Sequence, residues 1–120
     1  MGNYILICDD DEGVIDIASI VLKEKGYDVQ VCKDSDSLIE MVTLKRPDLL
    51  LLDLWMPGLN GEQITIELKS NKDTKNIPIL IVSANKDIEK VAKFSGADDF
   101  LPKPFDIEVL ENKVENLLKK

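Results

Sequence analysis

The most informative stretch of this chain is Pro47-Asp48-Leu49-Leu50-Leu51-Leu52-Asp53-Leu54-Trp55-Met56-Pro57-Gly58-Leu59-Asn60-Gly61. Leu49 to Leu52 form an unbroken apolar run, which predicts a strand buried on both faces, as in the middle of a parallel sheet. Pro57, Gly58 and Gly61 predict a loop after it. Ligands of open α/β sheets bind outside the carboxyl ends of the strands. Asp53 lies at such an end and is therefore the first candidate for a reacting residue.

Strand-like and helix-like segments alternate five times around this stretch. Short apolar runs predict strands at 4–8, 29–32, 49–52, 77–82 and 99–101. Apolar residues at helical spacing predict a helix after each strand, at 14–22, 38–42, 64–68, 88–92 and 107–118. We therefore predict one α/β domain over residues 1–120: a doubly wound, flavodoxin-like fold whose five-stranded parallel sheet has the order 2-1-3-4-5 and helices on both faces.

Composition and charge exclude several classes of function. The formal net charge of −8 argues against binding of a nucleic-acid backbone by this domain. The chain contains no histidine, which removes Ser/His and Cys/His catalysis and means that the chain cannot be its own phosphohistidine donor. No apolar stretch is long enough to span a membrane and no signal-peptide pattern opens the sequence, so a cytoplasmic location is predicted.

The two cysteines, Cys8 and Cys32, end separate apolar runs without disulfide or metal-site spacing. We predict that both are small buried residues in a reducing cytoplasm.

Polar side chains follow four of the predicted strands. The first strand ends in Asp9-Asp10-Asp11-Glu12, the third in Asp53, the fourth in Ser83, and the fifth runs into Lys103-Pro104-Phe105. Taken singly, these residues have ordinary interpretations as a solvated helix start, a helix cap or a surface lysine. Their joint placement at the carboxyl edge of one sheet instead indicates a functional site.

Carboxylates that point into one cleft repel each other unless a cation joins them. Oxygen ligands without histidine or an available thiolate favour a hard ion, Mg²⁺ before Ca²⁺, and Mg²⁺ prefers few carboxylates together with a phosphate oxygen. This chemistry fits a site in which Asp53 attacks a phosphoryl group and becomes an acyl phosphate. Mg²⁺ and Lys103 would then neutralise the phosphoryl oxygens, and the Ser83 hydroxyl would donate a hydrogen bond to one of them.

In this order, the motifs resemble the receiver domain of two-component response regulators, as in chemotaxis regulators. The resemblance extends from residue 5 to residue 118. It rests on Ile5-Leu6-Ile7-Cys8-Asp9-Asp10-Asp11, on Asp53 with Met56-Pro57-Gly58 and Gly61, on Ser83-Ala84, and on Gly96-Ala97-Asp98-Asp99-Phe100-Leu101-Pro102-Lys103-Pro104-Phe105. Two positions depart from the commonest pattern, because Ser83 replaces Thr and Trp55 places a large aromatic two residues past Asp53, where such residues are uncommon. Phe100 also lacks the hydroxyl of the commoner Tyr.

The resemblance implies a role for each site residue. Asp53 would be the phosphoacceptor, while Ser83 and Lys103 fall on the family's conserved hydroxyl and lysine. Mg²⁺ would be bound by Asp10, Asp53 and the backbone carbonyl of Trp55, with Asp9 reaching it through water. The bond between Lys103 and Pro104 is expected to be cis.

The resemblance also implies a phosphorelay function. A sensor histidine kinase or a histidine phosphotransfer protein would supply the phosphoryl group. The domain would catalyse only its own phosphorylation and dephosphorylation, and so would be a signalling domain rather than an enzyme. Phosphorylation would draw Ser83 toward the phosphoryl group and let Phe100 rotate inward. The surface of the fourth helix, fifth strand and fifth helix would then change shape, control an output partner or domain, and provide a face for a homodimer.

Two further hypotheses concern individual side chains. Kinase specificity would lie on the first helix and the strand-five loop, where Gly13, Val14, Asp16, Ile17 and Ile20 could face a partner. The single tryptophan, Trp55, would be either a loop residue that half covers the sheet edge or, jointly with Asn85, a shield that restricts water at the acyl phosphate.

Three rival interpretations remain at this point. Asp9-x-Asp11 resembles the nucleophile motif of haloacid-dehalogenase-type phosphatases, but Gly13 stands where that motif has Thr or Val, and Asp53 would have no role. A flavodoxin-like FMN binder shares the topology, but the acidic run would repel its phosphate. A phosphorylation-independent interaction domain would not need the five site residues. No output domain follows the last helix, which fits either a stand-alone regulator or a receiver cut from a longer protein.

Overall fold

The computed structural model describes residues 3–56 and 59–119. Five parallel strands form its main sheet, in the spatial order β2 (Asp28–Cys32), β1 (Tyr4–Cys8), β3 (Leu49–Leu52), β6 (Ile79–Ser83) and β7 (Asp99–Pro102). Numbered along the chain, the five strands of this sheet have the order 2-1-3-4-5. The predicted doubly wound fold is therefore confirmed.

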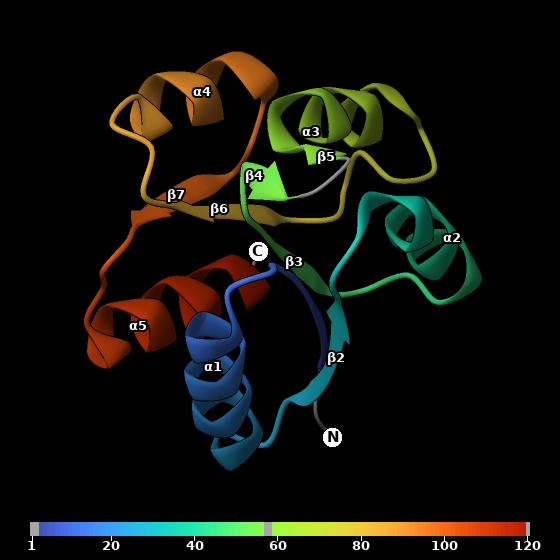
Figure 1. The fold of residues 1–120 in the computed structure, drawn as a ribbon. Coiled ribbons are helices and arrows are strands. Elements are labelled where there is room, and N and C mark those ends of the chain that lie inside the picture. Colours follow the sequence, from blue (N-terminus) through green and yellow to red (C-terminus); the bar gives the residue numbers. More distant parts are fainter. Residues whose placement is uncertain (1–2, 57–58, 120) are drawn as a thin grey trace.

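Helices cover both faces of the sheet (Figure 1). One face carries α1 (Glu12–Glu24) and α5 (Ile107–Leu118), and the other carries α2 (Ser35–Leu44), α3 (Gly61–Ser70) and α4 (Ile88–Ser95). Because strand side chains alternate between faces, the core divides into two clusters. Leu50 and Leu52 belong to the cluster under α2, α3 and α4, whereas Leu49 and Leu51 belong to the cluster under α1 and α5.

The central strand β3 holds Asp53 in a fixed place. All four of its leucines are buried, and each buried leucine side chain contributes roughly 1.5–3 kcal/mol of hydrophobic stabilisation. The backbone N–H of Asp53 extends this anchoring, since it donates to the carbonyl of Cys8 at 2.9 Å. The reacting candidate thus follows directly from a strand whose residues are all buried.

Two details of the predicted elements are corrected. The fourth strand of the sheet begins at Ile79 rather than at residue 77, because Pro78 has no N–H for a ladder bond and the N–H of Ile77 donates to the carbonyl of Thr74 in the preceding turn. The segment after Asp53 also contains an antiparallel pair of two-residue strands, β4 (Trp55–Met56) and β5 (Leu59–Asn60). Of the three predicted loop residues, Gly61 is instead the first residue of α3, and Pro57 and Gly58 lie outside the described residues.

Several smaller expectations are confirmed. Gly26 follows α1 in the left-handed region, with φ 91°, and its N–H donates to the carbonyl of Lys23. The peptide bond between Lys103 and Pro104 is cis. Both cysteines are free and buried. Of the helices that the structure describes, none has the length and apolar character that crossing a membrane requires.

Candidate functional site

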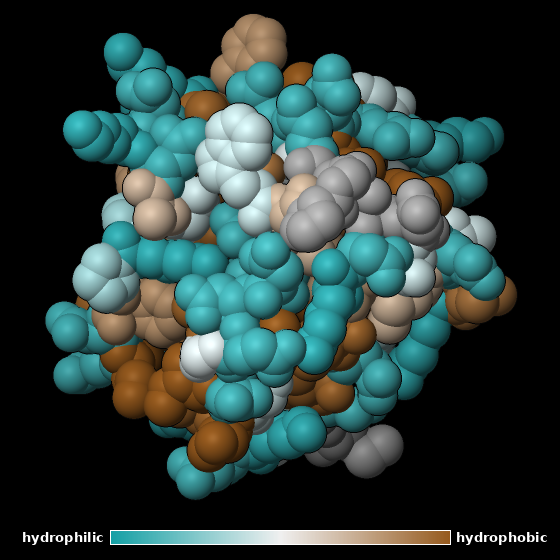
Figure 2. Space-filling model, in the orientation of Figure 1, coloured by the Kyte–Doolittle hydropathy of each residue, from teal (hydrophilic) through white to brown (hydrophobic). Residues whose placement is uncertain are grey.

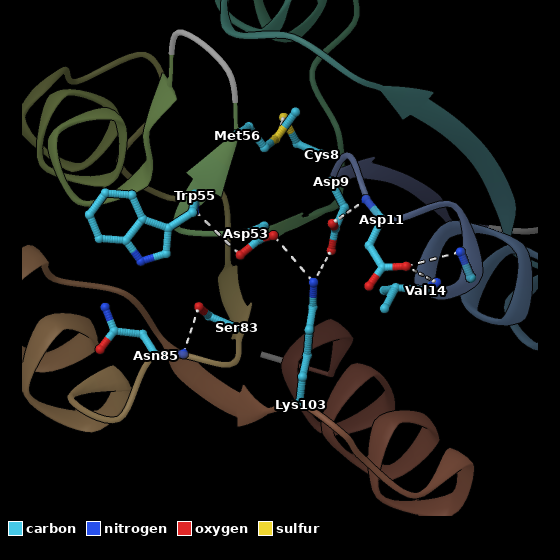
Figure 3. Close-up of polar contacts among 11 residues, drawn as sticks. Cys8, Asp9, Asp11, Val14, Asp53, Trp55, Met56, Ser83, Asn85 and Lys103 are labelled. Carbon is cyan, nitrogen blue, oxygen red and sulfur yellow. Dashed lines mark hydrogen bonds and ion pairs between the residues drawn. The ribbon is translucent and has the colours of Figure 1, made fainter.

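The predicted site residues meet at the carboxyl edge of the sheet (Figure 3). Asp9 follows β1, Asp53 follows β3, Ser83 is the last residue of β6, and Lys103 follows β7. The strands β1, β3, β6 and β7 are consecutive neighbours in the sheet, so these four side chains are delivered side by side. The structure thus brings these four residues together at one edge of the sheet, as the sequence predicts.

Three carboxylates form the acidic part of the site. Asp9, Asp10 and Asp53 each offer an oxygen, and these oxygens all lie within 4.8 Å of one another. Asp9 and Asp53 are buried, with 2% and 7% of their surface exposed, whereas Asp10 is exposed. Two buried carboxylates this close together are stable as a pair only with a cation beside them.

Asp11 is the member of the acidic run that serves a structural purpose. Its Oδ1 accepts the backbone N–H groups of Gly13 and Val14, at 3.0 and 3.3 Å, and so caps α1. Its own N–H donates to Oδ1 of Asp9 at 2.9 Å. Asp11 therefore starts the helix and holds Asp9 at the same time.

Lys103 supplies a positive charge between the two buried carboxylates. Its Nζ lies 2.9 Å from Oδ2 of Asp9 and 3.2 Å from Oδ2 of Asp53, and 13% of its side chain is exposed. The lysine backbone is fixed as well, because its N–H donates to the carbonyl of Ser83 at 2.9 Å. These contacts tie β1, β3 and β6 to the segment after β7.

The protonation equilibria reflect this crowding. Burial raises the pKa of the Asp9 carboxyl, and the charge of Asp53 raises it further, against the opposing effects of the Asp11 N–H and Lys103. Burial lowers the pKa of the Lys103 ammonium, but the hydrogen bonds and charges of Asp9 and Asp53 outweigh it, and the pKa ends above its usual value. Among the described residues of the acidic cluster, the two buried carboxylates thus share one lysine, and Asp10 adds a third negative charge beside them.

Ser83 and Trp55 complete the rim. Ser83 is buried, and its Oγ accepts the N–H of Asn85 at 3.2 Å, which leaves its O–H free to donate elsewhere. The N–H of Trp55 approaches Oδ1 of Asp53 at 3.4 Å, while 66% of this tryptophan is exposed. A cavity of about 420 Å³ opens over the site; its lining residues are Asp10, Asp11, Asp53, Trp55, Ser83, Ala84, Asn85 and Lys103.

The donor atoms of the site fit a hard divalent cation. Carboxylate oxygens line it, and the thiol of Cys8 instead contacts the thioether of Met56 in the core, with the sulfur atoms 3.5 Å apart. Mg²⁺ prefers this set of oxygen ligands. The cation would relieve the repulsion among Asp9, Asp10 and Asp53 that one lysine leaves uncompensated.

Comparison with known proteins agrees with this geometry. Residues 5–115 match the response regulator receiver domain, and the chain therefore belongs to the family of receiver domains of two-component response regulators. The DNA-binding dual master transcriptional regulator RpaA of Synechocystis sp. is 40% identical over 118 residues, which are 97% of this chain and 49% of that protein. The response regulator MprA of Mycobacterium ulcerans is 39% identical over 122 residues, which are 100% of this chain and 52% of that protein. The chain thus spans about half the length of these curated relatives.

A solved structure has the same fold. The receiver domain of the sensor histidine kinase PA1611 from Pseudomonas aeruginosa PAO1 superimposes with a TM-score of 0.90 at 24% identity, and the match covers 100% of both chains. That structure has a magnesium ion coordinated in its active site cleft. The family assignment replaces the phosphatase and flavin-binder interpretations.

Proposed function

We propose that this receiver domain accepts a phosphoryl group on Asp53 from the phosphohistidine of a sensor histidine kinase or a histidine phosphotransfer protein. One observation carries the proposal: Asp53 lies buried at the end of the central strand, beside Asp9 and Asp10 and 3.2 Å from the ammonium of Lys103. We assign residues 1–120 to this one receiver domain.

The reaction is an in-line transfer. A carboxylate oxygen of Asp53 attacks the phosphorus, the bond between phosphorus and the histidine nitrogen breaks, and that nitrogen keeps the electron pair. Lys103 shifts its ammonium from the carboxylates toward a phosphoryl oxygen, and the Ser83 hydroxyl donates to another. Positioning and charge provide the catalysis, so the chain needs no histidine of its own.

The acidic cluster provides the metal site in this proposal. Asp10, Asp53 and the backbone carbonyl of Trp55 would hold Mg²⁺, with Asp9 reaching it through water, in line with the magnesium seen in the cleft of the PA1611 receiver. When bound, the ion supplies positive charge that neutralises the phosphoryl oxygens. Asp9 and Asp53 keep their oxygens oriented by the contacts to Asp11 and Lys103. The same site would catalyse hydrolysis of the acyl phosphate, and no other turnover.

The switch would run through Phe100. This ring packs against the core cluster under α4, with the ammonium of Lys113 5.7 Å from its centroid. Movement of Ser83 toward the phosphoryl group would vacate space for the ring and reshape the surface of α4, β7 and α5. If Phe100→Ala leaves partner binding fully dependent on phosphorylation, the ring is not the switch.

A kinase would dock beside α1. A cavity of about 570 Å³ lies between α1 and the segment after β7; it is lined by Asp11, Gly13, Val14, Ile17, Ala84, Lys103, Pro104, Phe105 and Ile107. Hydrophobic side chains gather over α1 and α5 in Figure 2, and 56% of Ile20 is exposed. A phosphohistidine docked here would lie next to Lys103. Ile20→Ser should slow transfer from the kinase and leave phosphorylation by acetyl phosphate unchanged.

The output lies with a partner or with a further domain. RpaA is a DNA-binding transcriptional regulator that is about twice as long as the matched region. By analogy, the whole protein to which this receiver belongs would carry a DNA-binding output domain. Because the net charge of −8 disfavours contact between this receiver and a nucleic-acid backbone, such a domain would make that contact. The face of α4, β7 and α5 is also where a phosphorylation-dependent homodimer would form.

The decisive experiment uses Trp55, the only tryptophan, which lies two residues from Asp53. Its fluorescence is followed during titration with Mg²⁺ and then with acetyl phosphate or beryllium fluoride, with Asp53→Asn in parallel. A metal-dependent change, followed by a second change that Asp53→Asn loses, supports both the ion site and the phosphoacceptor. No response, together with an intact mass that shows no phosphoryl adduct, would favour the phosphorylation-independent interaction domain.

A further inference from the structure

Gly61, the first residue of α3, lies unusually close to the backbone of the phosphoacceptor. A Cβ built on Gly61 would be 2.7 Å from the carbonyl oxygen of Asp53 and 2.8 Å from Cα of Leu54. Carbon atoms in protein contacts stay about 3.5 Å or more apart, so a side chain of any size at this position requires backbone movement. The closest obstacle is the peptide unit of Asp53 itself.

One backbone bond joins the first turn of α3 to the segment after β3, and two further bonds order the turn itself. The N–H of Gly61 donates to the carbonyl of Leu54 at 3.1 Å, and the carbonyl of Gly61 accepts the hydroxyl of the fully buried Thr65 at 2.8 Å. The Asn60 side chain caps the helix through the N–H of Gln63. The helix therefore cannot retreat from Asp53 without breaking the bond between Gly61 and Leu54.

Asp53 is held from the other side as well. Its N–H donates to Cys8 in β1, and its carboxylate pairs with Lys103. Its peptide unit is thus clamped between the sheet and the first turn of α3. The absence of a Cβ at Gly61 allows the first turn of α3 to lie this close to the Asp53 peptide.

We propose that Gly61 is a positioning residue. Because it has no side chain, the first turn of α3 can pack against the Asp53 peptide and hold the Asp53 carboxylate close to Asp9, Asp10 and Lys103. The proposal rests on Asp53 being the phosphoacceptor and a metal ligand. It assigns the glycine a function in the site rather than in a turn, since its φ does not lie in the left-handed region, unlike those of Gly26 and Gly96.

Gly61→Ala tests the proposal, with Gly26→Ala as the matched control. Gly26 has φ 91° and open space around it, so an alanine there strains the backbone at the amino end of the sheet and lowers the melting temperature by roughly 3–10 °C. It should leave the Mg²⁺ dissociation constant and the rate of phosphorylation by acetyl phosphate unchanged. A merely structural glycine at position 61 would behave like Gly26.

Displacing the Asp53 peptide by about half an ångström should weaken Mg²⁺ binding about tenfold and slow phosphorylation roughly 10–100-fold, at saturating metal. Gly61→Ser should match Gly61→Ala, because the Cβ makes the contact. In EDTA, the amide resonances of Asp53 and Leu54 should shift in both variants and stay in place in Gly26→Ala.

Wild-type metal affinity and rate in a folded Gly61→Ala protein would overturn the proposal. If that variant does not fold, Thr65→Val, which releases the hydroxyl bond to Gly61 at nearly constant volume, should still weaken Mg²⁺ binding a few-fold, and no change would overturn it equally. Phosphorylation of the wild type is scored separately by intact mass. Its failure would reject Asp53 as phosphoacceptor, while the metal and amide measurements would still decide the role of Gly61.

Discussion

Carboxylates at the amino end and at the carboxyl end of the sheet differ in the partners that they have. At the amino end, carboxylates have local partners: Asp48 accepts the N–H of Tyr4 at 2.7 Å, and Asp98 accepts both the N–H of Ile79 at 2.8 Å and the ammonium of Lys69 at 2.6 Å. At the carboxyl end, the described carboxylates Asp9, Asp10 and Asp53 lie together, and the ammonium of Lys103 pairs with Asp9 and Asp53.

This difference separates stability from function. Hydrogen-bonded carboxylates at the amino end hold loops to the starts of strands, and removing one of them leaves a backbone N–H group without its partner. Surplus negative charge at the carboxyl end is unfavourable until a cation neutralises it. Equivalent substitutions at the two ends should therefore have opposite effects on stability and on phosphorylation.

The largest effect is expected from Asp53→Asn. The amide is a poor nucleophile, so phosphorylation by acetyl phosphate should be abolished while the fold is kept. Asp98→Asn should do the reverse: it weakens the contacts to Ile79 and Lys69, lowers stability by about 1–3 kcal/mol and leaves phosphorylation intact. Intact mass and thermal denaturation of both variants provide the measurements. A phosphoryl adduct on Asp53→Asn would place the acceptor elsewhere.

A second pair of variants compares the two bridging lysines. Because Lys103 is the proposed stabiliser of the developing phosphoryl charge, Lys103→Met should slow phosphorylation roughly 10²-fold. The same change should tighten Mg²⁺ binding a few-fold, because it removes a competing positive charge from Asp9 and Asp53. Stopped-flow fluorescence of Trp55 gives both quantities.

Lys69→Met is the control for this pair, because Lys69 is also largely buried and also bonds a carboxylate. It should lower the melting temperature without changing the phosphorylation rate. Weaker metal binding in Lys103→Met would mean that the lysine helps to build the ion site instead of competing with it.

Sequence patterns predicted most of this carboxyl end. Parallel strands share one edge, so charged residues after several strands had to meet, and Asp9, Asp53, Ser83 and Lys103 do. Residue spacing alone could not separate the tasks within the acidic run, and only the family resemblance assigned Asp9 and Asp10 to the metal. That division depends on α1 beginning at Glu12, which makes Asp11 the cap and leaves Asp10 in the cluster.

Other features could not be predicted from the sequence, because they depend on how segments that are distant in the sequence pack together. Gly61 reads as a loop residue, and its importance follows from the distance of α3 to Asp53, which no local pattern encodes. The pair β4 and β5 is too short for any periodicity to appear. Cys8 and Cys32 end separate runs in the sequence, yet they are register partners on neighbouring strands.

A smaller effect is expected from Asp9→Asn in metal-free protein. Burial raises the pKa of Asp9 above its ordinary 3.8, so the folded state binds this proton more tightly than the unfolded state. The favourable contribution of protonated Asp9 is complete below that value and is lost as pH rises through the raised pKa. In EDTA near pH 7, Asp9→Asn should therefore raise the melting temperature, by roughly 3–6 °C for each ~1 kcal/mol.

The pH profile sharpens this test. The gain in Asp9→Asn over wild type should shrink as pH falls toward 4, where Asp9 begins to be protonated in both states. Added Mg²⁺ should stabilise the wild type and have much less effect on the variant. A destabilised Asp9→Asn protein at neutral pH would show that the ion pair with Lys103 outweighs the burial of Asp9.

The smallest effect is expected from Trp55→Ala, which tests whether the exposed rim of the site matters at all. The indole and Asn85 line the cavity above Asp53, and both also line a smaller cavity of about 100 Å³ beside it. A side chain that is 66% exposed can hinder but not exclude water, so hydrolysis of the acyl phosphate should accelerate only about 2–5-fold. The loss of phosphoryl adduct is followed by intact mass after removal of the donor.

Because Trp55→Phe keeps a flat ring over the cavity, its hydrolysis rate should lie between those of the wild type and Trp55→Ala. Equal rates in all three proteins would make Trp55 an ordinary residue of the sheet edge and confine water control to the buried residues.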